Sequence, residues 1–303
     1  MSDIGCDELQ SECECQKWAD APIILIILQR EEITMIPFNI QAAIEIVRTV
    51  GDELRSRYVS FKPVIDNASM MAAFQEVDGS ASNWLREALA AKYPDVRWLS
   101  GELEGAGGWR TVCSGRYWVC DAIDGAVQFL RHVPHWVVSL TLVEDGAAIA
   151  TIIYDPMHDE MFHAVTGEGA WCNGERQNVN DRQTHHGALV ATSQPPFSND
   201  DEFAVNGAVS SLNVALRQAG AVRNLGPTSL QIAYVASGRL DAFWEYGEDT
   251  FNCLGGALLV TEAGGLATDM SGRPYGIASN SILAAPEPVN ASLRAAFGTL
   301  RQI

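Results

Sequence analysis

Positive charge and long hydrophobic runs are both scarce in this chain of 303 residues. Lysine and arginine number 20 against 38 aspartates and glutamates, which gives a formal net charge of −18. Nucleic-acid binding requires cationic side chains that neutralise phosphates, so this balance predicts that nucleic acid is not a partner. The apolar run from Pro22 to Leu28 is far too short to cross a bilayer, and we therefore expect no membrane association.

The seven cysteines lack the spacing of a disulfide framework. Reduced thiols are typical of the cytoplasm, which is the predicted location. Cys6, Cys13 and Cys15 cluster near the N-terminus, where a metal or redox role is the alternative to unmodified thiols. The other cysteines lie in regular segments and are expected to be small buried side chains: Cys113, Cys120, Cys172 and Cys253.

Residues 1–34 are predicted to stand apart from the folded domain. The flank that precedes the apolar run is acidic, which is the wrong sign for a secretory signal. Two explanations remain open. The segment is either a disordered extension or a non-native upstream start, with Met35 opening the folded domain.

From Pro37 onward the hydrophobic pattern becomes regular. Apolar residues at helical spacing predict a helix over 40–58, and a second helix is expected over 78–92 with Asp78 or Ser80 as its cap. Strand-like segments follow, and helices then alternate with short strands. This order predicts an α+β layered sandwich, with one subdomain over residues 35–182 and a second over residues 187–303.

The most informative stretch runs from Trp118 to Gly125. An apolar strand leads into Asp121 and Asp124, and Gly125 allows a sharp turn. Buried carboxylates require a positive partner, and a hard divalent ion such as Mg²⁺ suits clustered carboxylate oxygens. Glu102 follows the preceding strand and could share such a metal. The alternative is that these acids are surface charges that cap turns.

The turn at Gly125 and Ala126 opens what we predict to be a short helix. The free N–H groups at a helix N-terminus favour an anion, so a phosphate could bind there beside the metals.

The chain from about Met35 onward resembles the inositol monophosphatase family of metal-dependent phosphatases. The resemblance rests on segments in the same order and spacing: Gly101-Glu102, Asp121–Gly125, Tyr154-Asp155-Pro156, Gly167–Gly174 and Val260–Gly265.

The resemblance implies a layered α-β-α-β-α sandwich, assembled as a homodimer, that uses two or three Mg²⁺ ions to hydrolyse a phosphate monoester. One ion would be held by Glu102, Asp121 and the carbonyl of Ile123, and a second by Asp121 and Asp124. A water near Glu102 would attack the phosphorus, and Asp78 would orient or activate that water.

The resemblance also implies a substrate pocket. The backbone of Gly125 and Ala126 would bind the phosphate, and Glu245 would contact a substrate hydroxyl. The ligand class that fits these features is a small phosphorylated polyol, sugar or nucleotide.

Two residues depart from the family pattern at the site. Asn252 stands where the family has an aspartate that binds the second metal, so the affinity of that metal should fall. Asp249, one helical turn upstream, either replaces this ligand or caps the helix. Ala126 replaces a hydroxyl residue that hydrogen-bonds the nucleophilic water, a contact whose loss costs about 10²–10⁴-fold in rate.

Two functions follow from this pattern. The first is a Mg²⁺-dependent phosphomonoesterase that hydrolyses a small phosphorylated molecule. The second is a catalytically impaired relative that binds a phosphorylated ligand or a protein partner, because Ala126 and Asn252 weaken the chemistry but leave the backbone turn in place.

Overall fold

The computed structural model describes residues 38–298, apart from 61, 65, 100–113 and 197. Contacts along the chain separate residues 1–38 from a compact unit formed by residues 39–303. The predicted extension over residues 1–34 and the predicted ligand Glu102 therefore lie outside the described residues. The expected division between subdomains at 182–187 stays a prediction.

The first half of the described chain forms a sheet whose strands follow the chain order, β1 to β7. All neighbouring strands in it are antiparallel except the parallel pair β1 and β2. Its central strands are buried along most of their length because helices cover both faces. The strands are β1 (Arg97–Trp98), β2 (Arg116–Asp124), β3 (Val137–Glu144), β4 (Ala147–Asp155), β5 (Glu160–Val165), β6 (Gly169–Cys172) and β7 (Glu175–Gln177).

The second half forms a mixed sheet in the order β11-β12-β10-β8-β9. The pairs β10–β8 and β8–β9 are parallel, whereas β12 pairs antiparallel with both of its neighbours. The strands are β8 (Leu189–Thr192), β9 (Ala221–Arg223), β10 (Ala242–Tyr246), β11 (Leu266–Thr268) and β12 (Ser281–Ala285).

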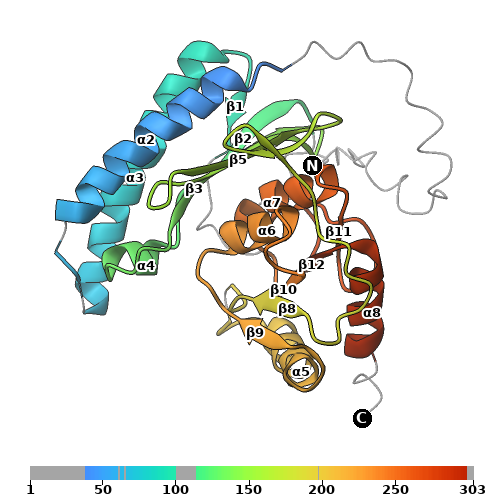
Figure 1. The fold of residues 1–303 in the computed structure, drawn as a ribbon. Coiled ribbons are helices and arrows are strands. Elements are labelled where there is room, and N and C mark those ends of the chain that lie inside the picture. The colour runs from blue at the N-terminus through green and yellow to red at the C-terminus, as the bar shows by residue number, and fades with distance from the viewer. Residues whose placement is uncertain (1–37, 61, 65, 100–113, 197, 299–303) are drawn as a thin grey trace, which may run out of the picture. The chain divides into compact units, whose positions relative to one another are not determined.

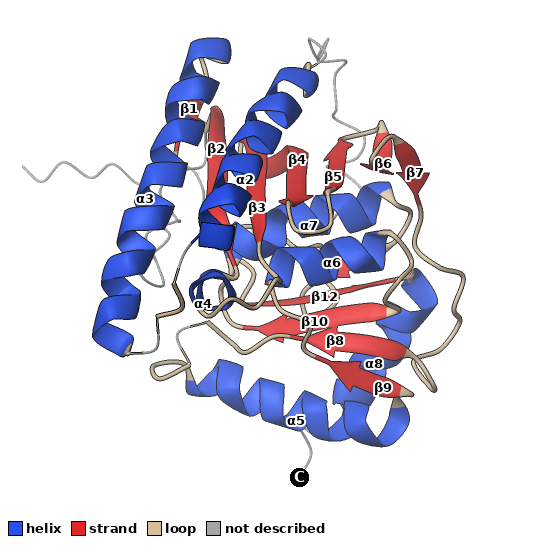
Figure 2. Ribbon diagram, turned by 60° about the vertical axis from the view of Figure 1, so that its left-hand side comes forward, coloured by secondary structure: helices blue, strands red, loops and turns tan. Residues whose placement is uncertain are grey.

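Helices and sheets alternate as five layers within residues 39–298 (Figures 1 and 2). Helices α2 and α3 cover the outer face of the first sheet, α6 and α7 lie between the sheets, and α5 and α8 cover the second sheet. The predicted α-β-α-β-α sandwich is confirmed. The helices are α2 (Gln41–Ser60), α3 (Asn67–Lys92), α4 (Ala126–Leu130), α5 (Glu202–Gln218), α6 (Thr228–Ala236), α7 (Thr250–Glu262) and α8 (Glu287–Gly298).

The start of α3 differs from the sequence prediction. The helix is capped by Asp66, whose side chain accepts a hydrogen bond from the Ser69 N–H at 2.9 Å. The predicted caps, Asp78 and Ser80, lie inside the helix, where the Ser80 hydroxyl donates to the Glu76 carbonyl. Ser80 suggested a helix start, but a serine whose hydroxyl bonds the backbone of its own helix does not mark a boundary.

The central helix α7 packs closely against its neighbours because two glycines face them. A side chain at Gly255 would collide with Thr141 and Thr151 of the first sheet, and one at Gly256 would lie 2.6 Å from Ile232 of α6. One apolar cluster includes buried residues of α6, α7 and both sheets. None of the helices in the described part of the chain has the length and apolar character needed to span a membrane.

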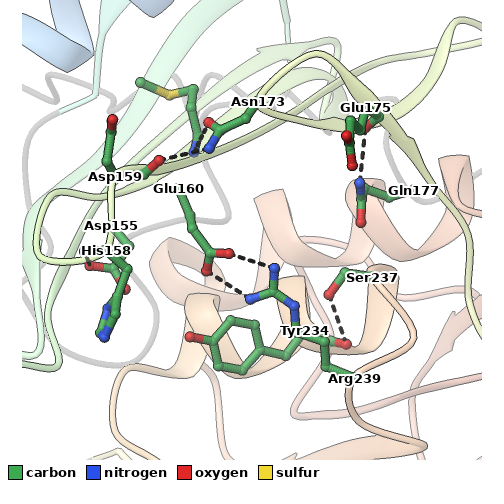
Figure 3. Close-up of polar contacts among 11 residues, drawn as sticks. Asp155, His158, Asp159, Glu160, Asn173, Glu175, Gln177, Tyr234, Ser237 and Arg239 are labelled. Atoms are coloured by element: carbon green, nitrogen blue, oxygen red, sulfur yellow. Dashed lines mark hydrogen bonds and ion pairs between the residues drawn. The ribbon is translucent and has the colours of Figure 1, made fainter.

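An ion pair joins β5 of the first sheet to the central layer (Figure 3). The Arg239 guanidinium, just after α6, donates two hydrogen bonds to the Glu160 carboxylate of β5, at 2.7 and 2.5 Å. The same guanidinium lies 5.0 Å from the centre of the Tyr234 ring. Two parallel hydrogen bonds fix the relative orientation of the two side chains as well as their distance.

Candidate active site

The site begins at the end of β2, where Asp121 and Asp124 are 4% and 6% exposed. The pairing of β2 with β3 shifts register between these two residues. Asp121 Oδ1 accepts a hydrogen bond from the Ile123 N–H at 2.9 Å, so the carboxylate folds back over its own backbone. The irregular end of β2 therefore carries two buried carboxylates, three residues apart in the chain.

Asp124 is held by the first turn of α6. Ser229 donates to Asp124 Oδ2 through both its backbone N–H, at 2.9 Å, and its hydroxyl, at 2.5 Å. Burial raises the pKa of Asp124 to about 6, with a further increase from the charge of Asp249, while the Ser229 hydrogen bonds act in the opposite direction. Sequence reasoning missed Ser229 because it is distant in the chain from its partner.

Glu245 lies on β10 of the second sheet and is 2% exposed. Its Oε2 accepts a hydrogen bond from the Thr228 hydroxyl at 3.0 Å, whereas its Oε1 is buried without a hydrogen-bond partner. Burial, followed by the charge of Asp249, raises the pKa of Glu245 well above its usual range. Neighbouring residues of α6, Thr228 and Ser229, thus bind one carboxylate from each sheet.

Asp249 caps α7, as one of the two sequence interpretations proposed. Its carboxylate accepts from the Asn252 N–H at 3.4 Å and from Asn252 Nδ2 at 3.0 and 3.2 Å. The Asn252 amide therefore turns its nitrogen toward Asp249, and its Oδ1 is buried without a hydrogen-bond partner. The predicted role of Asn252 as a metal ligand remains a prediction.

The turn after Asp124 depends on Gly125, which adopts a left-handed conformation with φ of 96°. A Cβ atom at this position would lie 2.8 Å from the His135 carbonyl oxygen and 3.0 Å from Pro227 Cγ. Only glycine combines this backbone conformation with such close neighbours. Ala126 is the first residue of α4, as the sequence predicted, and its binding of phosphate stays a prediction.

Asp78 lies in the middle of α3, which packs against β2 and α4. Its Oδ1 is buried without a hydrogen-bond partner. Burial raises the pKa of Asp78 to about 6. A carboxylate in this condition can accept a proton near neutral pH, which fits the predicted role of a base.

The structure brings three carboxylates into mutual electrostatic contact: Asp124, Glu245 and Asp249. Across the part of the chain that is described, no arginine or lysine forms an ion pair with any of them. The carboxylate oxygens, with Glu245 Oε1 unpartnered, fit a divalent cation, because the charged form of such a buried group requires a compensating charge.

Comparisons with known proteins agree with this architecture. The model of the inositol monophosphatase family matches residues 38–299. The chain is 36% identical over 200 residues to the Nus factor SuhB of Pseudomonas aeruginosa, covering 65% of this chain and 72% of the relative. It is 29% identical over 262 residues to the inositol-1-monophosphatase of Rhizobium meliloti, covering 86% and 93%.

A solved structure shares the fold. The crystal structure of the extragenic suppressor protein suhB from Bartonella henselae superposes with a TM-score of 0.71 at 27% identity. The match covers 84% of this chain and 97% of the crystallised protein.

Proposed function

Since the chain belongs to the inositol monophosphatase family, we propose that it is a Mg²⁺-dependent phosphomonoesterase acting on a small phosphorylated polyol, sugar or nucleotide. Membership of this family supports a phosphatase. The observation that supports the finer proposal is the mutual electrostatic contact of three acidic side chains from β2, β10 and the start of α7: Asp124, Glu245 and Asp249.

Asp121, Asp124 and the Ile123 carbonyl would hold the ions, together with Glu102 as the resemblance implies. Bound Mg²⁺ would lower the pKa of water and offset negative charge on the phosphate oxygens. Ser229 aims Asp124 and favours its charged form through two hydrogen bonds.

Three further groups act on the substrate and the water in this proposal. Asp78 Oδ1 would accept a proton from the attacking water, since no protein group occupies it. Thr228 orients the Glu245 carboxylate, which would contact a substrate hydroxyl as the resemblance implies. The backbone of Gly125 and Ala126 would bind the phosphate.

The test is Mg²⁺-dependent phosphate release from a panel of phosphorylated polyols, sugars and nucleotides. We expect turnover by the native chain and its loss in Asp124→Asn. The matched control is Asp201→Asn, because Asp201 is a carboxylate that caps α5 away from the site and asparagine also caps helices. Equal turnover in Asp124→Asn and the native chain would contradict the proposal.

A second candidate is a binding protein with weakened catalysis. It is favoured by Ala126, which lacks a hydroxyl, and by Asn252, whose Nδ2 faces Asp249. Several relatives carry the name Nus factor SuhB, which names no phosphatase activity. The double variant Ala126→Thr/Asn252→Asp separates the two candidates: phosphate release that occurs only in the variant supports the binding protein, and strong native turnover excludes it.

Assembly as a homodimer and residence in the cytoplasm belong to the same proposal, on the strength of the family resemblance. Sedimentation of the purified chain tests the first, and a dominant monomer at micromolar concentration would refute it. Fractionation of the source cells tests the second.

A further inference from the structure

We propose that Glu245, Asp249 and Cys253 form a cation site of their own, which binds a thiophilic divalent ion of the Zn²⁺ class. One carboxylate oxygen from each acid and the Cys253 Sγ all lie within 4.8 Å of one another. Nothing in the expected Mg²⁺ chemistry at Asp121 and Asp124 uses this thiol.

The chain brings these three side chains together from two elements. Asp249 and Cys253 are four residues apart at the start of α7, and such residues lie on the same face of a helix. The Cys253 N–H also donates to the Asp249 carbonyl at 3.0 Å, which fixes this first turn. Glu245 reaches the same point from β10.

A second observation, independent of the clustering, points to a bound cation. Glu245 is 2% exposed, and Thr228 satisfies its Oε2 but leaves Oε1 without a hydrogen-bond partner. An ionised carboxylate with an empty oxygen is costly in the protein interior. Without a metal, the Glu245 carboxyl shares a hydrogen bond with Asp249. A cation among Glu245, Asp249 and Cys253 would take the place of the proton between these two acids.

The donor set selects the class of ion. Mg²⁺ prefers an octahedral shell of oxygen atoms and has little affinity for sulfur. Zn²⁺ accepts thiolate and carboxylate ligands together, and a site with three protein ligands leaves a fourth position for water or substrate. Ligand atoms around tetrahedral zinc lie about 3.5 Å apart. Small side-chain rotations would bring the three ligand atoms from their present separations of up to 4.8 Å to this distance.

Asn252 has a positioning role in this arrangement. Its Nδ2 donates to both oxygens of the Asp249 carboxylate, at 3.0 and 3.2 Å. An aspartate at position 252 would instead set a like charge against Asp249. The departure from the family at Asn252 therefore fits a chain in which Asp249 supplies the carboxylate of α7.

The first test is a titration of the full metal-stripped chain with Co²⁺, which reports thiolate ligation through a charge-transfer absorption band. We expect one equivalent to produce the band, Cys253→Ser to abolish it and Cys172→Ser to retain it. Cys172 is the matched control because it is also a buried free cysteine. Absence of the band in the native chain, or its persistence in Cys253→Ser, overturns the proposal.

A second set of variants keeps the test valid if Cys253→Ser fails to fold. Asp249→Asn preserves the helix cap and should weaken Zn²⁺ binding more than tenfold, and Asn252→Ala about tenfold, while Asp201→Asn leaves it unchanged. Equal Zn²⁺ affinity in Asp249→Asn and the native chain contradicts the proposal. A band that disappears when Cys6, Cys13 and Cys15 become serine, with Cys253 intact, also contradicts it.

The outcome does not depend on the proposed phosphatase activity, because metal binding is measured without substrate. A chain that shows the cobalt band but releases no phosphate refutes the proposed function alone. A chain that releases phosphate with Mg²⁺ but gives no band refutes the thiol site alone.

Discussion

Ser229 donates two hydrogen bonds to one oxygen of Asp124, across the boundary between the first sheet and the central helix layer. Because Asp124 is buried, these donors replace water around its charge. The contact couples the stability of the fold to the ionisation of a candidate metal ligand.

Ser229→Ala should destabilise the protein, because it removes the hydroxyl and leaves only the backbone donor. Hydrogen bonds to charged groups contribute about 1.5–3 kcal/mol, so we expect a loss of this order at pH 7 in urea unfolding with EDTA present. Ser237→Ala is the control, since Ser237 lies at the end of the same helix and bonds only a backbone carbonyl. An equal decrease in the free energy of unfolding in the two variants would contradict a stabilising role for the Ser229–Asp124 hydrogen bond.

Gly125→Ala should be more destabilising than Gly174→Ala. Both glycines have a positive φ, 96° and 83°, so both variants carry the strain of a left-handed alanine, about 1–2 kcal/mol. The added Cβ at Gly174 meets open space, whereas at Gly125 it meets His135 O. We expect an extra cost of about 1–3 kcal/mol at Gly125, measured by chemical unfolding. Similar costs at both positions would contradict the close packing of this turn.

Asp78 should make stability fall as pH rises. Its folded pKa is about 6, above the ordinary 3.8, so the native state holds a proton that the unfolded state releases between these values. In EDTA, Asp78→Asn should match the native chain near pH 3.5 and exceed its stability by about 3 kcal/mol above pH 6.5. The exposed Asp200→Asn is the control. A pH-independent difference between Asp78→Asn and the native chain would contradict the burial of this carboxyl.

The pair Glu160 and Arg239 should contribute measurably although it is partly exposed. The two hydrogen bonds between the side chains and the contact of Arg239 with the Tyr234 ring both stabilise the pair. We expect a coupling energy of about 1 kcal/mol in a double-mutant cycle of Glu160→Gln and Arg239→Met. The exposed helical pair Glu53 and Arg57 is the comparison, with an expected coupling of about 0.3 kcal/mol. A coupling energy at Glu160 no larger than at Glu53 would refute this expectation.

Features set by local sequence could be predicted well. The helical period over 40–58 predicts α2, which the structure places at Gln41–Ser60. The Asp121 to Gly125 stretch correctly placed two acids at the end of a buried strand.

Features set by tertiary contact could not be predicted in the same way. Strand β8 (Leu189–Thr192) has only four residues after a polar stretch, which is too short a pattern to predict a strand. Ser229 and Thr228 were missed because a serine or threonine at a helix start has an ordinary capping role, and only the fold brings these residues to Asp124 and Glu245. Their partners lie 105 and 17 residues away in the chain.

Thr228 and Ser229, at the start of α6, each donate a hydrogen bond to an acidic side chain, one from each sheet. A sliding motion of one sheet over the other would have to break or drag both attachments at once. The two attachments therefore oppose such a sliding motion and help to hold the two acids at a fixed spacing.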